Sequence, residues 1–199
     1  MNRRNVIAWA MAAMLLPGCA ALPGGGPAPL DTYDLTSAAA QAEGSRRSRT
    51  QILIAEPTAL KVLDGENVVI RPSAATVEFL KGAQWADRLP RIVQSRLAET
   101  MQASGRYGGV GKPGEGLAID YQIVTEIRAF EIRVDGSARA DVRLYVKVLN
   151  DRNGVVRAAR TFQAQAPVGG AGNDAYVEAL DSAFGQISRE IASWVGSTI

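Results

Sequence analysis

Two stretches of alternating apolar and polar residues limit the folds open to this chain. Residues 142–148 have an apolar side chain at every second position, and residues 117–133 alternate in the same way. Successive side chains of a β-strand point to opposite faces, so each stretch predicts a strand with one buried face. The turn sequence 151–154 ends in Gly154, which tolerates positive φ, and residues 155–164 return as a third strand. We therefore expect an antiparallel core.

Two long helices are predicted from apolar residues at helical spacing. The first covers about residues 87–104, where Asp87 is expected to cap the first turn and Pro90 is tolerated near the start. Gly105 is expected to end this helix, since glycine adopts the left-handed conformation without penalty. The second helix covers about residues 173–195. Its apolar stripe consists of Tyr176, Leu180, Phe184, Ile187, Ile191 and Trp194.

Shorter strands are predicted in the first half of the chain. Residues 32–35 and 50–55 are β candidates, and residues 67–71 and 75–81 form a hairpin that turns at residues 72–74. Combined with the longer elements, they predict an α/β (α+β-like) fold. We expect a mixed, largely antiparallel sheet with two long amphipathic helices.

Residues 1–18 have the three zones of a secretory signal peptide. Arg3 and Arg4 give a positive start, residues 6–16 form an apolar run, and small residues follow. The apolar run is about a dozen residues long, well short of the roughly 20 that span a bilayer as a helix. We therefore expect residues 1–18 to direct export.

The tetrapeptide Leu16-Pro17-Gly18-Cys19 is similar to the lipobox of bacterial lipoproteins, with Pro17 as a departure from the usual residue. This resemblance implies that Cys19 is lipidated. Several acyl chains, at about 0.8 kcal/mol per buried CH₂, hold a protein firmly on a bilayer. By the same resemblance, Ala20 at the position of the inner-membrane retention signal implies the periplasmic face of the outer membrane.

The residues after the lipidation site divide into a tether and a folded part. Residues 19–30 are rich in glycine and proline, which disfavour both helix and sheet, so we expect a flexible tether. The length and composition of residues 31–199 are those of one globular domain, and the lipoprotein resemblance implies that this domain is periplasmic.

Composition excludes several kinds of chemistry. The chain has one cysteine and no histidine, which leaves no internal disulfide, no soft metal site and no imidazole base. Without Arg3 and Arg4, the 22 basic residues fall to 20 and balance the 20 acidic ones. Nucleic-acid binding depends on a basic excess, so we expect no nucleic-acid partner.

The remaining motifs do not support catalysis. Residues 109–114 match G-x-G-x-x-G, but a dinucleotide site needs a helix after the motif. Here Pro113 lies inside the motif and a strand is predicted to follow, which favours a glycine loop. Asp120 and Glu126 fall on the polar face of a predicted strand, where solvated carboxylates are common. We assign no catalytic, metal-binding or cofactor-binding residue, and we expect neither an enzyme nor a cofactor.

Two short segments are candidates for surface contacts. The basic run Arg46-Arg47-Ser48-Arg49 is able to touch anionic headgroups, although a solvated loop is the favoured interpretation because the run is short. Trp85 stands between the predicted hairpin and the first helix. We favour a packing role for it at the start of the helix, and a partner contact if its side chain is exposed.

The order of features resembles the ABC-type transport auxiliary lipoproteins associated with MCE-type lipid transport systems. The matching features are Cys19, Tyr33-Asp34-Leu35, residues 84–90 at the start of the first helix, and Ser104-Gly105-Arg106-Tyr107 at its end. The resemblance implies a three-layer α/β sandwich. It also implies a non-enzymatic accessory subunit beside an MCE-domain protein and an inner-membrane permease and ATPase.

An alternative function is a stand-alone periplasmic lipid carrier. A carrier needs a continuous apolar cavity of several hundred Å³, whereas an accessory subunit needs a surface patch. A phospholipid or sterol-like lipid is a candidate ligand in either case. The sequence leaves the substrate lipid and the oligomeric state open, including a homo-oligomer.

Overall fold

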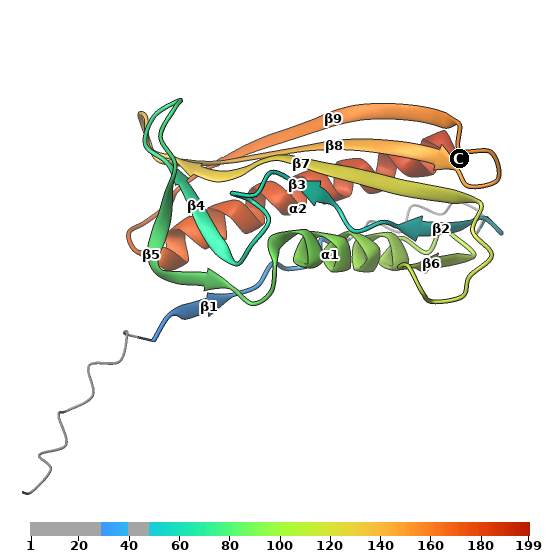
Figure 1. The fold of residues 1–199 in the computed structure, drawn as a ribbon, viewed down its shortest axis with the longest axis horizontal. Coiled ribbons are helices and arrows are strands. Elements are labelled where there is room, and N and C mark those ends of the chain that lie inside the picture. Colours follow the sequence, from blue (N-terminus) through green and yellow to red (C-terminus); the bar gives the residue numbers. More distant parts are fainter. Residues whose placement is uncertain (1–28, 40–47) are drawn as a thin grey trace, which may run out of the picture.

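The computed structural model describes residues 29–39 and 48–199. Within these ranges the chain forms one nine-stranded sheet and two helices (Figure 1). The signal peptide, Cys19 and nearly all of the tether lie outside the described residues. The elements are β1 (Asp31–Tyr33), β2 (Gln51–Ile54), β3 (Thr58–Ala59), β4 (Asn67–Arg71), β5 (Glu78–Trp85), α1 (Leu89–Ala103), β6 (Gly109–Gly111), β7 (Tyr121–Arg133), β8 (Arg139–Asn150), β9 (Val156–Pro167) and α2 (Asn173–Thr198).

The sheet is mixed, and its longest ladders are antiparallel. Strands β7, β8 and β9 form a meander of two antiparallel ladders, as the alternating pattern predicted. On its other side β7 pairs in parallel with β2, β3 and β4. Strand β2 also pairs in parallel with β6, and α1 lies between them along the chain, as a parallel crossover requires. The predicted α+β fold class is confirmed.

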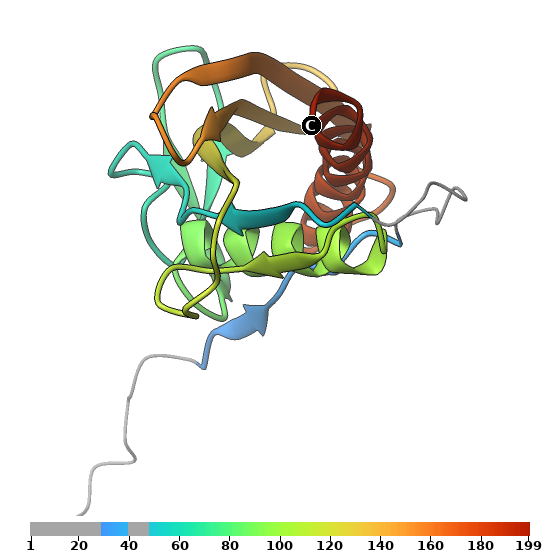
Figure 2. The ribbon, with the colours of Figure 1, turned by 90° about the vertical axis from the view of Figure 1, so that its right-hand side faces the viewer.

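The core lies between the sheet and the helices. Helix α2 packs against β8 and β9, and α1 contacts β2, β6 and α2, as Figure 2 shows from one end of the molecule. The sheet therefore does not separate the two helices where they meet. Full burial of a large apolar side chain contributes about 1.5–3 kcal/mol, so the predicted α2 stripe is a main source of stability. Its fully buried members are Leu180, Phe184, Ile187 and Ile191.

The start of α1 differs from the prediction. Arg88 is the N-cap residue, and no side chain caps the helix. The Asp87 carboxylate instead accepts a hydrogen bond from the backbone N–H of Arg88 at 2.6 Å, while the Leu89 N–H donates to the Gly65 carbonyl at 3.0 Å. A capping side chain must reach the second or third helical amide, and Asp87 lies one residue too early. The predicted stop is confirmed, since Gly105 has φ of 65°.

The hairpin of β4 and β5 is also shifted from its prediction. Strand β5 starts at Glu78 and continues to Trp85. The β4–β5 register shifts between its two ends, and Gly82 in β5 has φ of 76°. In β5 the Phe79 side chain is 48% exposed, whereas Leu80 and Trp85 are buried.

A short N-terminal strap, residues 33–36, fastens the start of the domain to both helices. The backbone N–H and the hydroxyl of Thr36 donate to the Asp181 carboxylate of α2 at 2.7 and 2.6 Å. Asp34 forms an ion pair with Arg96 of α1, and Leu35 between them is buried. The chain that leads in from the N-terminus is therefore held at several points.

The strap also contains a tyrosine whose titration reports on its attachment. The Tyr33 hydroxyl donates to Asp174 at 2.6 Å, and this hydrogen bond is the main reason why the pKa of Tyr33 rises from 10.0 to about 12. Because the folded state raises this pKa, the contact stabilises the fold fully below about pH 10 and is lost as the pH rises toward 12.

Asp174→Asn is expected to move the titration of Tyr33 back toward its ordinary pKa, because the carboxylate charge is lost. The near-ultraviolet absorbance of tyrosinate measures this, with Tyr33→Phe to assign the signal. Asp181→Asn is the matched control, since Asp181 holds Thr36 and not Tyr33. An unchanged Tyr33 titration in Asp174→Asn would contradict the assignment.

Candidate functional site

The sheet has an outer face, opposite to the face that α2 covers. On β8 the fully buried core residues alternate with Arg143, Tyr145 and Lys147, which are partly exposed. On β9, Gln163 and Gln165 occupy the same outer face through their pairing with Arg143 and Asp141. The outer face of β8 and β9 therefore carries polar and charged side chains that are available for contacts with other molecules.

One row of residues crosses the outer face over five strands. The register aligns Phe79 of β5 with Val69 of β4, Glu131 of β7, Asp141 of β8 and Gln165 of β9. Val69, Glu131 and Asp141 are only 2%, 4% and 2% exposed. Two buried carboxylates thus lie directly opposite each other on neighbouring strands, an arrangement that is destabilising unless other charges compensate.

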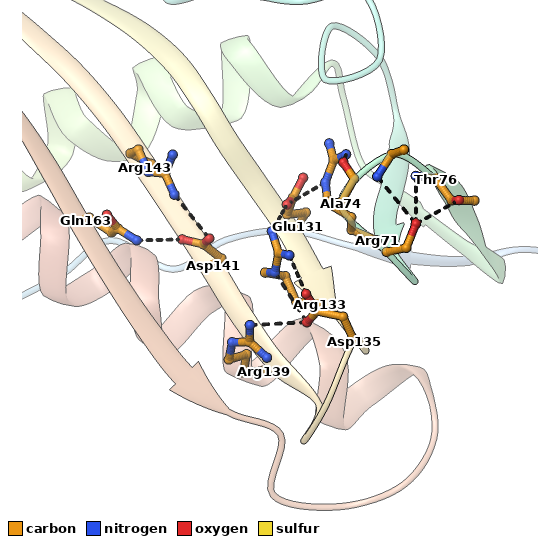
Figure 3. Close-up of polar contacts among 12 residues, drawn as sticks. Arg71, Ala74, Thr76, Glu131, Arg133, Asp135, Arg139, Asp141, Arg143 and Gln163 are labelled. Carbon is orange, nitrogen blue, oxygen red and sulfur yellow. Dashed lines mark hydrogen bonds and ion pairs between the residues drawn. The ribbon is translucent and has the colours of Figure 1, made fainter.

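Two arginines compensate the negative charge of the buried Glu131 carboxylate. Arg71 of β4 donates through Nε to Glu131 Oε1 at 2.7 Å, and Arg133 Nη1 lies 3.5 Å from the same oxygen (Figure 3). Both arginine side chains are about one-fifth exposed and cover the carboxylate from outside. A buried carboxylate is tolerated only when paired and hydrogen-bonded in this way.

Asp141 has a separate set of partners. Arg143 donates through Nη2 to Asp141 Oδ2 at 3.4 Å, and Gln163 of β9 donates through Nε2 to Oδ1 at 3.3 Å (Figure 3). The two carboxylates are therefore held from opposite sides of the β7–β8 ladder, by β4 and by β9.

A third carboxylate lies just beyond β7. Arg133 donates through Nε to Asp135 at 3.4 Å, and Arg139 Nη2 lies 3.2 Å from the same carboxylate. The hydrogen bond from Arg133 is the main reason why the pKa of Asp135 falls below its usual range. We call the whole set the arginine–carboxylate network. Its charged members are Arg71, Glu131, Arg133, Asp135, Arg139, Asp141 and Arg143.

The network is suited to binding. It holds four arginines and three carboxylates, a cationic excess of one, and its guanidinium groups stay partly exposed. Guanidinium has five N–H donors, more than these ion pairs use. Exposed apolar side chains lie beside it: Val77, Phe79 and Val134 are 37%, 48% and 37% exposed. Arginine next to aromatic and aliphatic groups is typical of protein interfaces.

Trp85 is part of the core. It is 2% exposed, and its ring meets Phe130 edge-to-face at 5.8 Å between centroids. Phe130 in turn contacts Phe184 of α2 at 5.9 Å. The partner-contact prediction for Trp85 required an exposed ring and is wrong. The buried ring instead packs inside the core against Phe130 of β7.

The two carboxylates considered for acid–base chemistry do not meet. Asp120 accepts a hydrogen bond from the Gln51 backbone N–H at 3.0 Å, and Glu126 pairs with Arg128 at 3.2 Å. Six positions along an extended chain separate them by about 20 Å. Each carboxylate therefore has its own structural contact, Asp120 with Gln51 and Glu126 with Arg128.

The other sequence motifs also have simple structural roles. Gly109–Gly111 forms β6 beside β2 and leads into a turn, so no helix follows the glycine motif. Arg46 and Arg47 of the basic run lie outside the described residues, and the Ser48 N–H donates to the Arg106 carbonyl at 2.8 Å. Over the described ranges, neither helix has the length and apolar character required to cross a bilayer.

Residues 33–192 match the sequence family described as ABC-type transport auxiliary lipoprotein component. The chain belongs to this family. It is also 30% identical over 190 residues to bll6063, a protein of Bradyrhizobium diazoefficiens described as uncharacterized. That alignment includes 90% of this chain and 49% of the relative. The auxiliary lipoprotein sequence thus spans about half the length of this curated relative.

Solved structures share the fold of this auxiliary lipoprotein. Protein XCC0632 from Xanthomonas campestris superposes with a TM-score of 0.77 at 23% identity, covering 84% of this chain and 95% of that one. The hypothetical protein CT253 from Chlamydia trachomatis has a TM-score of 0.54 at 11% identity, covering 76% and 98%. At these identities the likeness is one of fold.

Sequence reasoning did not single out Glu131 and Asp141. Asp141 follows the polar phase of the β8 alternation, but Glu131 shares the odd-numbered phase of the apolar residues Ile123 and Ile127. The register irregularity between Ile127 and Ala129 reverses that phase and places Glu131 on the outer face. A tight connection centred on Gly136 places residues equally distant from it opposite each other, and Glu131 and Asp141 are such a pair. Their burial, however, depends on Arg71 and Gln163, which come from distant parts of the chain.

Proposed function

We propose that this protein is a lipid-anchored periplasmic accessory subunit of an MCE-type ABC transport system that moves lipids across the cell envelope. The observation that carries the proposal is the family match over residues 33–192. The role is binding rather than catalysis, and the partners are an MCE-domain protein and an inner-membrane permease and ATPase. The exposed guanidinium and apolar groups of the outer face support a role in protein contacts.

The proposed anchor sets the geometry of the system. Cys19 carries the acyl chains, at the periplasmic face of the outer membrane. Residues 19–30 then form the tether, and an extended chain covers at most about 3.6 Å per residue, so the reach is about 40 Å. The strap at Tyr33 follows almost at once and is fixed to both helices. The partner must therefore come close to this membrane, as a trans-envelope assembly does.

The outer face is the proposed partner surface. Its network has one more arginine than carboxylates, and Phe79 and Val134 flank it with exposed apolar area. This combination favours a partner patch with carboxylates around an apolar centre, because complementary charges fix register and exclude wrong partners.

Affinity purification of the full-length protein from its own cells in mild detergent tests the function. Co-elution of an MCE-domain protein with a permease and an ATPase is the expected result, and a clean preparation without them would refute the accessory role.

The combined substitution of Phe79→Ala and Arg139→Ala tests the outer face as the partner surface. It is expected to reduce recovery of the partners about tenfold or more, as losses at interface anchors do. Leu60→Ala combined with Arg152→Ala is the matched control, because both residues are exposed away from the network. Undiminished recovery with the first variant would reject this surface and leave the function standing.

Cys19→Ala is expected to abolish palmitate labelling and to release the protein from the membrane fraction, because no other cysteine is present. Metabolic labelling and fractionation measure both. Pro17→Ala should keep the label, since alanine is a usual lipobox residue. Ala20→Asp should keep the label and move the protein to the inner-membrane fraction. Labelling that persists in Cys19→Ala would contradict the proposed anchor.

A further inference from the structure

Strand β9 has a free edge. Over the residues that the structure describes, β9 pairs with β8 and with no other strand, although it extends over the 12 residues Val156–Pro167. An edge strand presents a row of unpaired N–H and C=O groups, which is a template for another strand. In both Figure 1 and Figure 2 β9 lies at the margin of the sheet.

A hollow lies between β9 and α2. Its volume is about 340 Å³, and Arg160 supplies its wall from β9. The α2 residues that line it are three, four and seven positions apart, so they share one face along the helix. Because the hollow lies between β9 and α2, a strand added to the edge of β9 would direct every second side chain toward it. The four α2 residues are Glu190, Ser193, Trp194 and Ser197.

The hollow offers an incoming side chain one aromatic group among polar ones. Trp194 is the apolar residue of its lining, and its ring packs edge-to-face against Phe162 of β9 at 5.4 Å between centroids. The Arg160 guanidinium stands 4.9 Å above the Phe162 ring. Glu190, the acidic group of the hollow, accepts a hydrogen bond from Gln186 at 3.0 Å. Arg160 is the cationic residue among the five that line the hollow.

The charges of β9 restrict which strands can pair with its edge. The strand carries Arg157 and Arg160 and contains no Asp or Glu. Arg160 is two positions from the buried Phe162, so it occupies an inward-facing position of an edge strand. An inward charge of this kind opposes pairing with unselected strands, and it favours a strand that supplies a carboxylate. Antiparallel pairing of two β9 strands beside the hollow would instead bring the arginines of two copies together.

We infer that β9 binds an extended segment of another protein as an added strand, with an acidic side chain paired to Arg160 and an apolar side chain in the hollow over Trp194. Main-chain hydrogen bonds along the edge supply affinity, and the hollow supplies specificity, as in other cases of strand addition. The inference goes beyond the proposed transport role, since it specifies a peptide chemistry and requires no transporter component.

Three synthetic peptides of about ten residues, long enough for one strand, test the inference with the full-length protein in detergent. The first alternates threonine and valine, with phenylalanine at a central valine position and glutamate at the valine positions two residues before and after it, so that these three side chains share one face. The second has lysines in place of the glutamates, and the third is the first with alternate backbone nitrogens methylated along one edge. Fluorescence anisotropy of labelled peptides gives affinity, and hydrogen exchange of residues 156–167 locates the site.

The acidic peptide is expected to bind about tenfold or more tightly than the lysine and N-methylated peptides and to slow exchange in β9. Arg160→Glu should reverse the preference for acidic over lysine peptide, whereas Lys61→Glu, the same charge change on a distant exposed loop, should not. Absence of acidic-peptide binding at about 1 mM overturns the inference. It is also overturned if neither N-methylation of the peptide nor Arg160→Glu changes the affinity. Self-association that protects β9 and excludes the peptide also overturns it, because a second copy would then be the occupant.

Discussion

Phe130→Ala is expected to lower the free energy of unfolding by about 3–5 kcal/mol, the range for removing a fully buried aromatic ring. Phe130 is 1% exposed and stands between two other aromatic rings. Its centroid lies 5.8 Å from Trp85 of β5 and 5.9 Å from Phe184 of α2. The ring thus joins three elements that are distant in sequence, and its loss leaves a cavity that none of them fills without moving.

Urea denaturation followed by circular dichroism measures this loss, and Phe79→Ala provides the matched control. Phe79 undergoes the same chemical change at a position that is 48% exposed. Its substitution is expected to change the free energy of unfolding by no more than about 0.5 kcal/mol, as for most surface changes. Equal losses in the two variants would show that the aromatic cluster is not the centre of the core. The contrast also separates stability from binding, because Phe79 belongs to the proposed partner surface.

Glu131→Gln is expected to lower the free energy of unfolding by about 2–3 kcal/mol. Removal of one partner from a buried ion pair costs about 3–5 kcal/mol, and the partial exposure of Arg71 and Arg133 reduces that figure. The amide keeps the shape of the side chain but leaves both arginines without their shared carboxylate charge. Urea denaturation near neutral pH measures the change. Arg152→Ala is the control, since Arg152 is 81% exposed in its ion pair with Asp120 and should contribute less than about 0.5 kcal/mol.

A double-mutant cycle with Asp141→Asn tests the placement of the two carboxylates. Glu131 and Asp141 are direct cross-strand partners, so each single substitution loses ion pairs and also relieves their mutual repulsion. In the double variant that repulsion is relieved once, not twice. We therefore expect the double variant to lose about 0.5 kcal/mol more than the sum of the single losses. If the loss of the double variant equals the sum of the two single losses, the two charges do not interact across the ladder.

The network links stability to the proposed binding role. Arg71 and Arg133 are needed to hold Glu131, yet about one-fifth of each side chain stays accessible. A partner carboxylate would share guanidinium groups that the fold has already ordered, which lowers the entropy lost on binding. For this reason Phe79 and Arg139, at the margin of the network, are better tests of binding than Glu131 at its centre.

The elements with strong local patterns could be predicted from the sequence. Strand β8 follows a period of two, β7 does so as far as Ile127, and the α2 stripe follows a period near 3.6, so the faces that enter the core were evident there. Beyond Ile127 a register irregularity reverses the phase of β7, which the sequence pattern did not show. Gly105 and Gly154 were placed correctly, and both have positive φ, at 65° and 69°. The features that carry the family resemblance also lie in the sequence, and the match over residues 33–192 confirms the family.

Tertiary structure decided the features that depend on distant pairing. Whether Trp85 was buried depended on Phe130, 45 positions along the chain, and whether Asp87 capped α1 depended on where Gly65 met the helix. The buried row across the outer face exists because β4 pairs in parallel with β7 and brings Arg71 to Glu131. A local pattern sets which side of a strand is polar. Only the strands beside it determine whether a charge on that side faces water or is buried against a partner, because burial and pairing are set by neighbours in space.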